Sequence, residues 1–66
     1  MQKYNITISF IYETKNGMIR KKDYKTVIEN LQEYNAADDI QARTDQLLHD
    51  GAIRPYFKVI TIKPTF

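Results

Sequence analysis

The side chains best able to do chemistry are one histidine and two aspartates near the end of a predicted helix. His49 is the only histidine, Asp45 precedes it by four residues and Asp50 follows it directly. Four-residue spacing places Asp45 and His49 on one side of a helix, so the three side chains could in principle contact a divalent ion. A histidine at the carboxyl end of a helix also interacts favourably with the negative end of the helix dipole. We interpret His49 in this second, structural way.

Other signatures of catalysis are weak. Asp38 and Asp39 are adjacent, and neighbouring helix positions diverge by about 100°, so their carboxylates do not face each other as an acid/base pair would. The only glycines are Gly17 and Gly51, which is too few for a phosphate-binding loop. The chain has no cysteine, so it has no disulfide and no thiolate metal ligand. We therefore expect a non-enzymatic protein without a catalytic residue, a metal ion or a cofactor.

A cluster of cations is the main candidate site. The stretch "GMIRKKDYK", residues 17–25, lies beside a predicted turn in a chain whose net charge is only +2. A protruding basic hairpin can contact the phosphates of a nucleic acid or an acidic protein surface. Lysines on an edge strand also discourage sheets from aggregating, so simple solvation is the alternative interpretation. The candidate partner-binding residues, which we call the basic hairpin, are Lys15, Arg20, Lys21, Lys22 and Lys25.

Length and composition predict one small folded domain over residues 1–66. The chain is 42% hydrophobic and 12% aromatic, which is enough for a packed core. No apolar run approaches the roughly 20 residues that span a bilayer, and the first residues lack the pattern of a secretory signal. We expect a cytoplasmic protein that makes no membrane contact.

The first strand is predicted at about residues 3–13, where apolar and polar residues alternate. Five apolar side chains at a spacing of two face one side, and the opposite side is mostly polar. "KNG" at 15–17 predicts a hairpin turn into a second strand at about 18–29. A two-residue loop would place lysines beneath aromatic rings, so we prefer a three-residue loop, which pairs Ile8 with Tyr24 and puts Gly17 in the left-handed conformation.

A helix is predicted at about residues 36–49, with Asn35 as its N-cap and Gly51 after its end. Before it, Leu31 and Tyr34 are expected to tuck under the edge of the domain. The helix pattern assigns these polar residues to the solvent side: Asp39, Gln41, Arg43, Asp45 and Gln46. A last strand is predicted at about 56–63, between Pro55 and Pro64.

The resulting order is β-β-α-β, in the α+β class. A helical connection makes the second and third strands run in the same direction, and the first strand fits between them. We therefore predict a three-stranded antiparallel sheet in order 2-1-3 with one helix packed on one face.

The other face of this sheet is a second candidate surface. The apolar residues of the last strand cannot all lie under one short helix, and an exposed apolar patch on a small domain indicates a partner or a homodimer. Single exposed apolar residues are also normal on protein surfaces, so the alternative interpretation is that these residues have no binding role. We assign Ile11, Tyr56 and Ile60 to the candidate apolar interface, with Val59 as the alternative to Ile60.

The pattern resembles the small early proteins of T-odd phages that bind and inhibit the host RNA polymerase. The residues that carry the resemblance are the alternating "ITISFIY", the helix "AADDIQARTDQLL" and the closing "FKVITIKP". The long basic hairpin and the segment 29–35 depart from that pattern. The resemblance implies a phage-encoded protein that docks on a host machine such as RNA polymerase and modulates it. The alternative that the basic hairpin keeps open is a DNA- or RNA-binding module, either as a monomer or as a dimer that doubles the basic surface.

Overall fold

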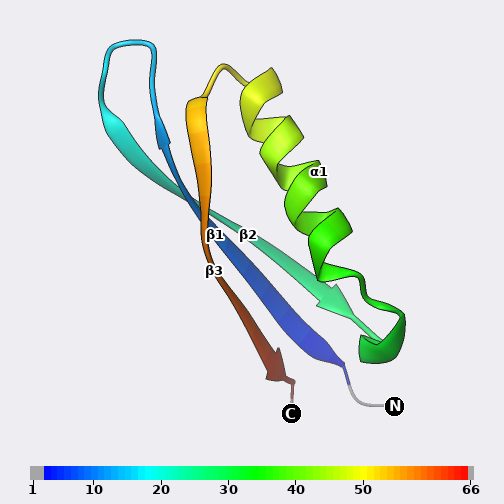
Figure 1. Cartoon of the computed structure of the whole chain (residues 1–66). Helices are drawn as coiled ribbons and strands as arrows, with labels where there is room; N and C mark the ends of the chain where they lie inside the picture. Colours follow the sequence, from blue (N-terminus) through cyan, green and yellow to red (C-terminus); the bar gives the residue numbers. More distant parts are fainter. Residues whose placement is uncertain (1–2, 66) are drawn as a thin grey trace.

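A three-stranded antiparallel sheet with one helix makes up the computed structural model, which describes residues 3–65. The elements are β1 (Tyr4–Glu13), β2 (Ile19–Ile28), a 3-10 turn η1 (Leu31–Glu33), α1 (Ala36–His49) and β3 (Ile53–Pro64). The sheet order β2-β1-β3 confirms the predicted fold. Figure 1 shows the elongated shape, 45 × 20 × 15 Å, with the hairpin at one end and both termini at the other. Residues 1–2 and 66 of the predicted domain lie outside the described residues.

The hairpin turn has the predicted three-residue loop. Ile8 pairs with Tyr24, as expected for that register. The amide of Thr14 donates to the Met18 carbonyl oxygen at 2.8 Å, and the amide of Gly17 donates to the Thr14 carbonyl oxygen at 3.0 Å. Gly17 has a φ of 81°, the left-handed conformation that a bulged turn requires.

Replacing Gly17 with alanine is expected to destabilise the protein by about 1 kcal/mol, because a side chain at positive φ strains the backbone. No atom lies within 4 Å of a Cβ built at this position, so crowding adds nothing to that cost. Asparagine tolerates the left-handed conformation, and Gly17→Asn is therefore the matched control with a smaller loss. Urea unfolding of the two variants measures the difference. Equal stability of wild type and Gly17→Ala would contradict the strain argument.

The core is small and centred on β1. Ile6, Ile8 and Phe10 are at most 1% exposed, and Leu47 of α1, at 4%, completes the buried apolar cluster. Alternation explains this arrangement: β1 is the middle strand, and the central side chains of one of its faces lie under the helix, whereas Tyr4 and Tyr12 at the ends are partly buried. Phe10 contacts the ring of Tyr24 edge-on at a centroid distance of 5.9 Å. The fold therefore depends on a few side chains from one strand.

The helix has the predicted caps. The side chain of Asn35 accepts a hydrogen bond from the Asp38 amide at 3.1 Å, which satisfies one of the free donors of the first turn. Asp50 is the C-cap, and Gly51 follows with a φ of 98°. The helix bounds agree with the predicted 36–49.

The third strand begins three residues earlier than the predicted 56–63, so the prediction that Pro55 marks its start is wrong. Pro55 lies inside β3, which is tolerated because β3 is an edge strand. The register against β1 shifts twice, once between Ser9 and Phe10 and once between Ile11 and Glu13. Beside the second shift, Arg54 has a φ of 53°. These irregularities let the strand extend past the proline.

Candidate binding surface

The face of the sheet turned away from α1 is not covered by any other helix or strand of the described chain. We call it the open face. Strand pairing places three rows of side chains on it, one from each strand. They are Asn5, Thr7, Ser9, Ile11 and Glu13 of β1; Ile19, Lys21, Asp23, Lys25 and Val27 of β2; and Ile53, Tyr56, Val59, Thr61 and Lys63 of β3.

An apolar patch lies in the half of the open face nearest the hairpin. Ile11 pairs with Tyr56 across the β1–β3 ladder and with Lys21 across the β1–β2 ladder. Tyr56 is 62% exposed and Val59 is 46% exposed. Ile11 therefore lies between Tyr56 and Lys21. A large exposed tyrosine is a favourable anchor for a protein interface, because it offers apolar area and a polar end.

Ile60 does not belong to this patch, and its assignment to the apolar interface is corrected. Ile60 pairs with Ile8, so it lies on the helix-covered side, where it packs against the core. Val59 occupies the open-face position next to Ser9 instead. Of the three predicted apolar residues, Ile11 and Tyr56 are brought together and Ile60 is separated from them by the thickness of the sheet.

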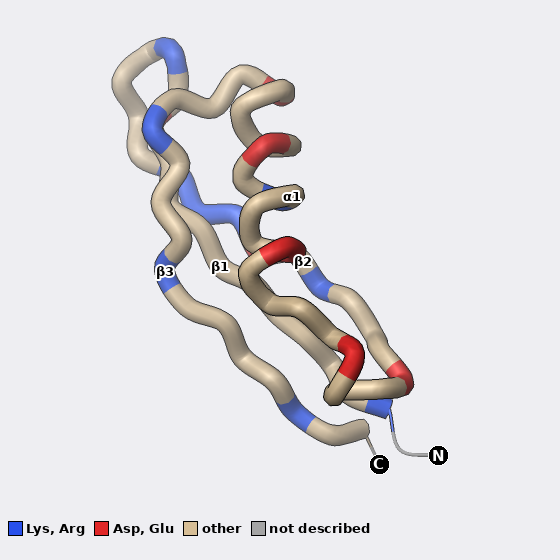
Figure 2. Tube along the Cα trace, turned by 45° about the vertical axis from the view of Figure 1, so that its right-hand side comes forward, with Lys and Arg blue, Asp and Glu red and all other residues tan. Residues whose placement is uncertain are grey.

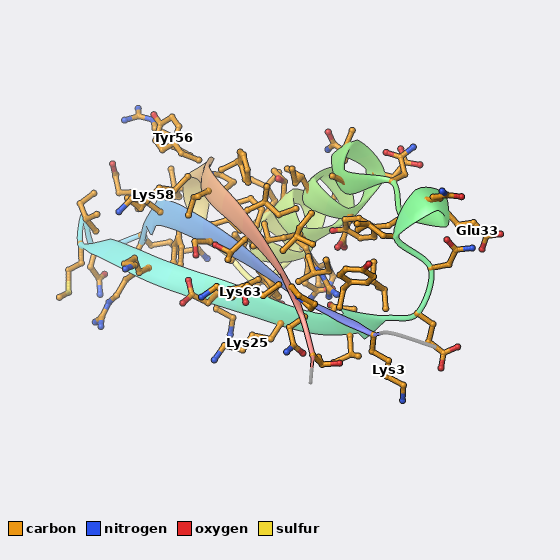
Figure 3. The ribbon with its side chains drawn as sticks, turned by 90° about the horizontal axis from the view of Figure 1, so that it is seen from below. Lys3, Lys25, Glu33, Tyr56, Lys58 and Lys63 are labelled. Atoms are coloured by element: carbon orange, nitrogen blue, oxygen red, sulfur yellow. The ribbon has the colours of Figure 1, made fainter. Side chains whose placement is uncertain are left out.

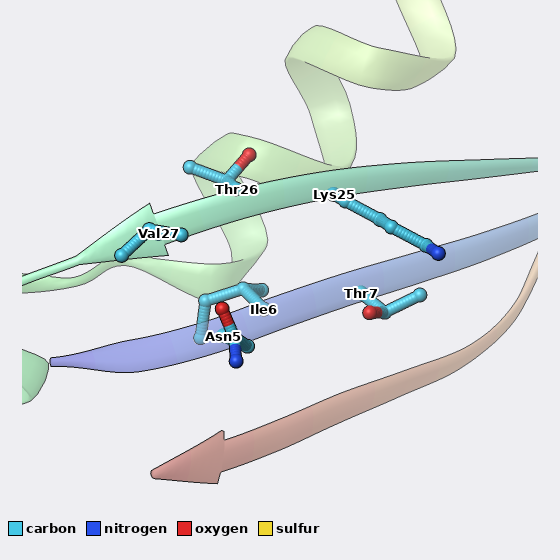
Figure 4. Close-up of a pocket in the computed structure, with 6 residues that line it drawn as sticks. All are labelled: Asn5, Ile6, Thr7, Lys25, Thr26 and Val27. Atoms are coloured by element: carbon cyan, nitrogen blue, oxygen red, sulfur yellow. The ribbon is translucent and has the colours of Figure 1, made fainter. Parts of the chain in front are cut away.

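The other half of the open face is polar and basic. Figure 3 shows Lys25 and Lys63 projecting from the side of the sheet opposite α1. Beside Lys25, a shallow depression of about 410 Å3 lies between β1 and β2; Figure 4 shows the residues around it, including Asn5, Thr7 and Val27. Hydroxyl, amide and ammonium groups here can donate hydrogen bonds to anionic or carbonyl oxygens.

The basic hairpin presents its cations on two sides. Pairing puts Lys21 and Lys25 on the open face, whereas Arg20 and Lys22 lie on the helix side, opposite Tyr12 and Phe10. All four side chains are exposed. The ammonium of Lys22 lies 5.6 Å from the centroid of the Tyr24 ring, within the range of a cation–π contact.

The cations of the hairpin form no ion pair within residues 3–65. The two ion pairs there join Arg43 to Asp39 at 3.3 Å and Arg54 to Glu13 at 3.7 Å. Lys15 differs from the others because its Cε lies 3.9 Å from a Cβ built on Gly51, next to the end of α1. The end of a helix is partly negative, so Lys15 has a favourable neighbour. Lys22 lies over the Tyr24 ring and Arg20 Nη2 donates to Met18 Sδ at 3.8 Å, so Lys21 and Lys25 are the hairpin cations best placed to contact a partner.

Charge is divided between the two sides of the molecule. Figure 2 shows the acidic residues mostly along η1 and α1 and the basic residues mostly on the strands and the hairpin. The three strands carry seven cations and two acids. The cations are Arg20, Lys21, Lys22, Lys25, Arg54, Lys58 and Lys63, and the acids are Glu13 and Asp23. The sheet therefore presents a positive surface, whereas the helix carries three aspartates and one arginine.

A polar network between α1 and β2 was not foreseen from the sequence. The hydroxyl of Tyr34 donates to Asp39 Oδ2 at 2.6 Å, and Asp39 Oδ1 lies 3.3 Å from Arg43 Nε. Arg43 Nη2 donates to Thr26 Oγ1 at 3.1 Å, and its guanidinium lies 5.1 Å from the centroid of the Tyr24 ring. The prediction that Asp39 and Arg43 face solvent is therefore wrong.

Two tyrosines near this network are harder to ionise than an ordinary tyrosine. Burial and the hydrogen bond to Asp39 raise the pKa of Tyr34. Burial, together with the charge of Asp50, raises the pKa of Tyr24, although Arg43 acts in the opposite direction. The Tyr34 hydroxyl therefore keeps its proton at neutral pH and can donate it to Asp39, which helps to hold α1 against the edge of the sheet.

Leu31 differs from its prediction. It is expected to tuck under the domain with Tyr34 but is 38% exposed.

His49, Asp45 and Asp50 do not form a metal site. All three are exposed, and Asp50 accepts hydrogen bonds from Gln46 Nε2 at 3.2 and 3.3 Å. Across residues 3–65, no group of three or more potential ligand side chains is close enough to hold a metal ion. In the same part of the chain, no helix is both long and apolar enough to cross a membrane.

Comparisons with known proteins give no relative. No protein-family model matches the chain, and neither a curated protein nor a solved structure is significantly similar to it.

Proposed function

We propose that this is a small non-enzymatic binding protein that docks on a larger macromolecular machine through the open face of its sheet. The observation that carries the proposal is the exposed Tyr56 and Val59 on the face that also carries Lys21 and Lys25, cations without an ion pair in the described chain. Tyrosine is a frequent anchor of protein interfaces, and cations on the same face favour an acidic partner.

The partner in this proposal is a protein and not a nucleic acid. Aliphatic side chains such as Val59 and Ile11 contribute to a protein interface, whereas a single-strand nucleic-acid platform needs several aromatic rings for base stacking. Among the sheet residues between 3 and 65, Tyr56 is the one ring on the open face, since the others lie on the helix side: Tyr4, Phe10, Tyr12, Tyr24 and Phe57. The mixture of apolar and basic residues therefore fits an acidic protein surface better.

Bacterial RNA polymerase is the first partner to test, because of the resemblance of the sequence pattern to phage-encoded inhibitors of that enzyme. Such a protein acts in the host cytoplasm by occupying a surface that the polymerase needs. Binding to purified polymerase and inhibition of transcription in vitro are the two direct measurements. Absence of a complex at micromolar concentrations of both proteins would exclude RNA polymerase as the partner.

Tyr56→Ala is expected to weaken binding to the polymerase by at least about 30-fold, because truncating a central aromatic anchor costs about 2 kcal/mol or more. Leu48→Ala is the control: Leu48 is 51% exposed but lies on the helix, so its removal should leave binding unchanged. Equal effects of the two substitutions would contradict docking through the open face.

The neighbouring lysines provide a second, matched test of the same face. Lys21→Glu places a negative charge on the open face, and Lys22→Glu places the same charge on the helix side. We expect Lys21→Glu to weaken binding by about tenfold or more and Lys22→Glu to have a much smaller effect, because one charge pair contributes about 1–2 kcal/mol when it is desolvated. Surface plasmon resonance of both variants measures this difference.

A DNA- or RNA-binding module is the second candidate, favoured by the cations on both sides of the hairpin. In that case Lys21→Glu and Lys22→Glu should weaken binding equally, and affinity should fall steeply with salt concentration. A gel-shift experiment that shows no complex at low salt would exclude it.

A further inference from the structure

The outer edge of β3 is open to a further strand. β3 is one of the two edge strands of the sheet, and apolar side chains project from both of its faces. Phe57 and Ile62, on the helix side, are 42% and 40% exposed, and Val59, on the open face, is 46% exposed. In Figures 1 and 2 no segment of residues 3–65 lies beside the outer side of the half of β3 nearest the C-terminus.

The register shows which backbone groups point outward. The amide of Thr65 donates to the Lys3 carbonyl oxygen at 2.8 Å, so the backbone of Thr65 faces β1. Backbone groups alternate in direction along an antiparallel strand, so Thr61 and Lys63 also face β1, while Ile60 and Ile62 direct their N–H and C=O groups outward. Pro55 and Pro64 have no N–H, and the bulge next to Phe57 interrupts the edge. The usable edge is therefore the short segment 59–63.

The edge formed by β2 is less suited to pairing. The residues there whose backbone groups point outward include Lys21, Asp23 and Lys25, and charged side chains on an edge strand oppose pairing with another sheet. At residues 59–63 the only charged side chain is Lys63. The two edges thus differ in their capacity to accept a strand.

Charge selects the occupant of the β3 edge. Residues 59–63 carry one cation, Lys63, and no acidic residue, and Lys58 directly precedes them, so pairing with the same segment of a second copy would join two segments that carry only positive charge. Like charges on neighbouring strands are destabilising, and opposite charges are stabilising. A complementary strand has acidic side chains next to Lys63 on the open face and apolar side chains next to Ile60 and Ile62 on the helix side.

We infer that residues 59–63 accept an extended segment of a partner protein as a fourth strand, and that this segment alternates apolar and acidic residues. The inference rests on the proposed function and states how the partner is held: main-chain hydrogen bonds give affinity and the alternating side chains give specificity. The added strand widens the open face on the side where Tyr56 and Val59 lie.

The test uses the full chain and a blocked eight-residue peptide of alternating valine and glutamate. Hydrogen exchange of the labelled protein is followed by NMR. We expect saturating peptide to slow exchange of the Ile60 and Ile62 amides by at least about tenfold, because both donors become hydrogen-bonded. A peptide with lysine in place of glutamate should bind at least about tenfold more weakly. Protection that is confined to the outward amides of β2, such as those of Asp23 and Lys25, would overturn strand addition at β3.

Two changes remove the proposed hydrogen bonds. Ile62→Pro deletes the outward donor, and proline is tolerated on an edge strand; Ile62→Thr keeps the donor and is the matched control. We expect Ile62→Pro to weaken peptide binding by about tenfold and Ile62→Thr to weaken it much less. A peptide methylated on the backbone nitrogens that face β3 should lose binding to the unaltered protein, which keeps the test valid if Ile62→Pro does not fold. Unchanged binding of the methylated peptide would overturn the inference.

The remaining outcomes separate this inference from the proposed function. A polymerase complex that survives Ile62→Pro but is lost in Tyr56→Ala would support the open face and overturn strand addition. Peptide binding at Ile60 and Ile62 without any polymerase complex would support strand addition and remove the target. If protection of the Ile60 and Ile62 amides rises with protein concentration in the absence of peptide, the edge pairs with a second copy of this chain. That result would overturn the inference that the edge accepts an acidic segment of a partner protein.

Discussion

Replacing Phe10 with alanine is expected to unfold most of the protein at room temperature. Phe10 is fully buried, and its ring contacts Tyr24 and Phe57 edge-on. Truncating a buried phenylalanine costs about 3–5 kcal/mol, because apolar contact is lost and a cavity remains. A core in a domain of this size supplies about 3–5 kcal/mol in total, so the loss is comparable to the whole stability. Far-UV circular dichroism and urea unfolding measure it.

Phe57→Ala is the matched control for this prediction. It removes the same ring, but Phe57 is 42% exposed and lies on an edge strand, so the loss of stability should be less than half as large. Phe10→Leu keeps most of the apolar volume and should remain folded. A Phe10→Ala protein that unfolds cooperatively within about 1 kcal/mol of wild type would show that the core has a different centre.

The hairpin and the sheet order were predictable because local chemistry and long-range packing agree there. Asn16 and Gly17 specify a turn, and the alternation of β1 favours the register that places Tyr24, Thr26 and Ile28 on the core side of β2. The helix bounds were predictable for the same reason, since Asn35 and Gly51 supply explicit start and stop signals. In these segments, the local sequence signals and the burial pattern favour the same secondary structure and register.

The third strand was less predictable because its apolar residues occupy consecutive positions. Val59 and Ile60 are both apolar, so alternation alone does not tell which of them faces the helix. The answer depends on the bulge between the pairs Ser9–Val59 and Phe10–Phe57, which no residue type in this segment specifies. The same ambiguity affects the predicted apolar interface. The prediction is correct for Ile11 and Tyr56, which share the open face, and wrong for Ile60, which lies on the helix side.

The network of Tyr34, Asp39 and Arg43 could not be read from helical spacing, because polar residues at these positions also fit a solvated face. The structure packs the first half of α1 close enough to β2 for Arg43 to reach Thr26 and the Tyr24 ring. Arginine and aspartate then line the edge of the core while their polar atoms contact one another. The pairing depends on where the helix lies over the sheet.

Asp39→Ala is expected to destabilise the protein by about 2–3 kcal/mol, the second largest effect on stability that we predict. The substitution removes the hydrogen bond from Tyr34 and the ion pair with Arg43. Hydrogen bonds to charged groups contribute about 1.5–3 kcal/mol, and a half-buried guanidinium left without its partner adds to the loss. Asp45→Ala, an exposed aspartate on the same helix, is the control and should change stability by less than about 0.5 kcal/mol.

A double-mutant cycle with Tyr34→Phe and Asp39→Ala isolates the bond between the two side chains. We expect a coupling free energy of about 1–2 kcal/mol in urea unfolding, because Tyr34→Phe deletes only the donor. Additive effects of the two substitutions would mean that the 2.6 Å contact contributes nothing to stability in solution.

The same bond predicts a dependence on alkaline pH. The pKa of Tyr34 is raised above its ordinary value of 10.0 in the folded protein. Above about pH 10 the unfolded chain therefore loses this proton while the folded chain keeps it, so the folded state binds more protons and stability falls as pH rises. The contribution is fully present below pH 10 and disappears as the pH passes the folded-state pKa. Urea unfolding at pH 8 and pH 11 should show a smaller fall in Tyr34→Phe than in wild type. Since Tyr24, whose pKa is also raised, is unchanged in this variant, the difference belongs to Tyr34.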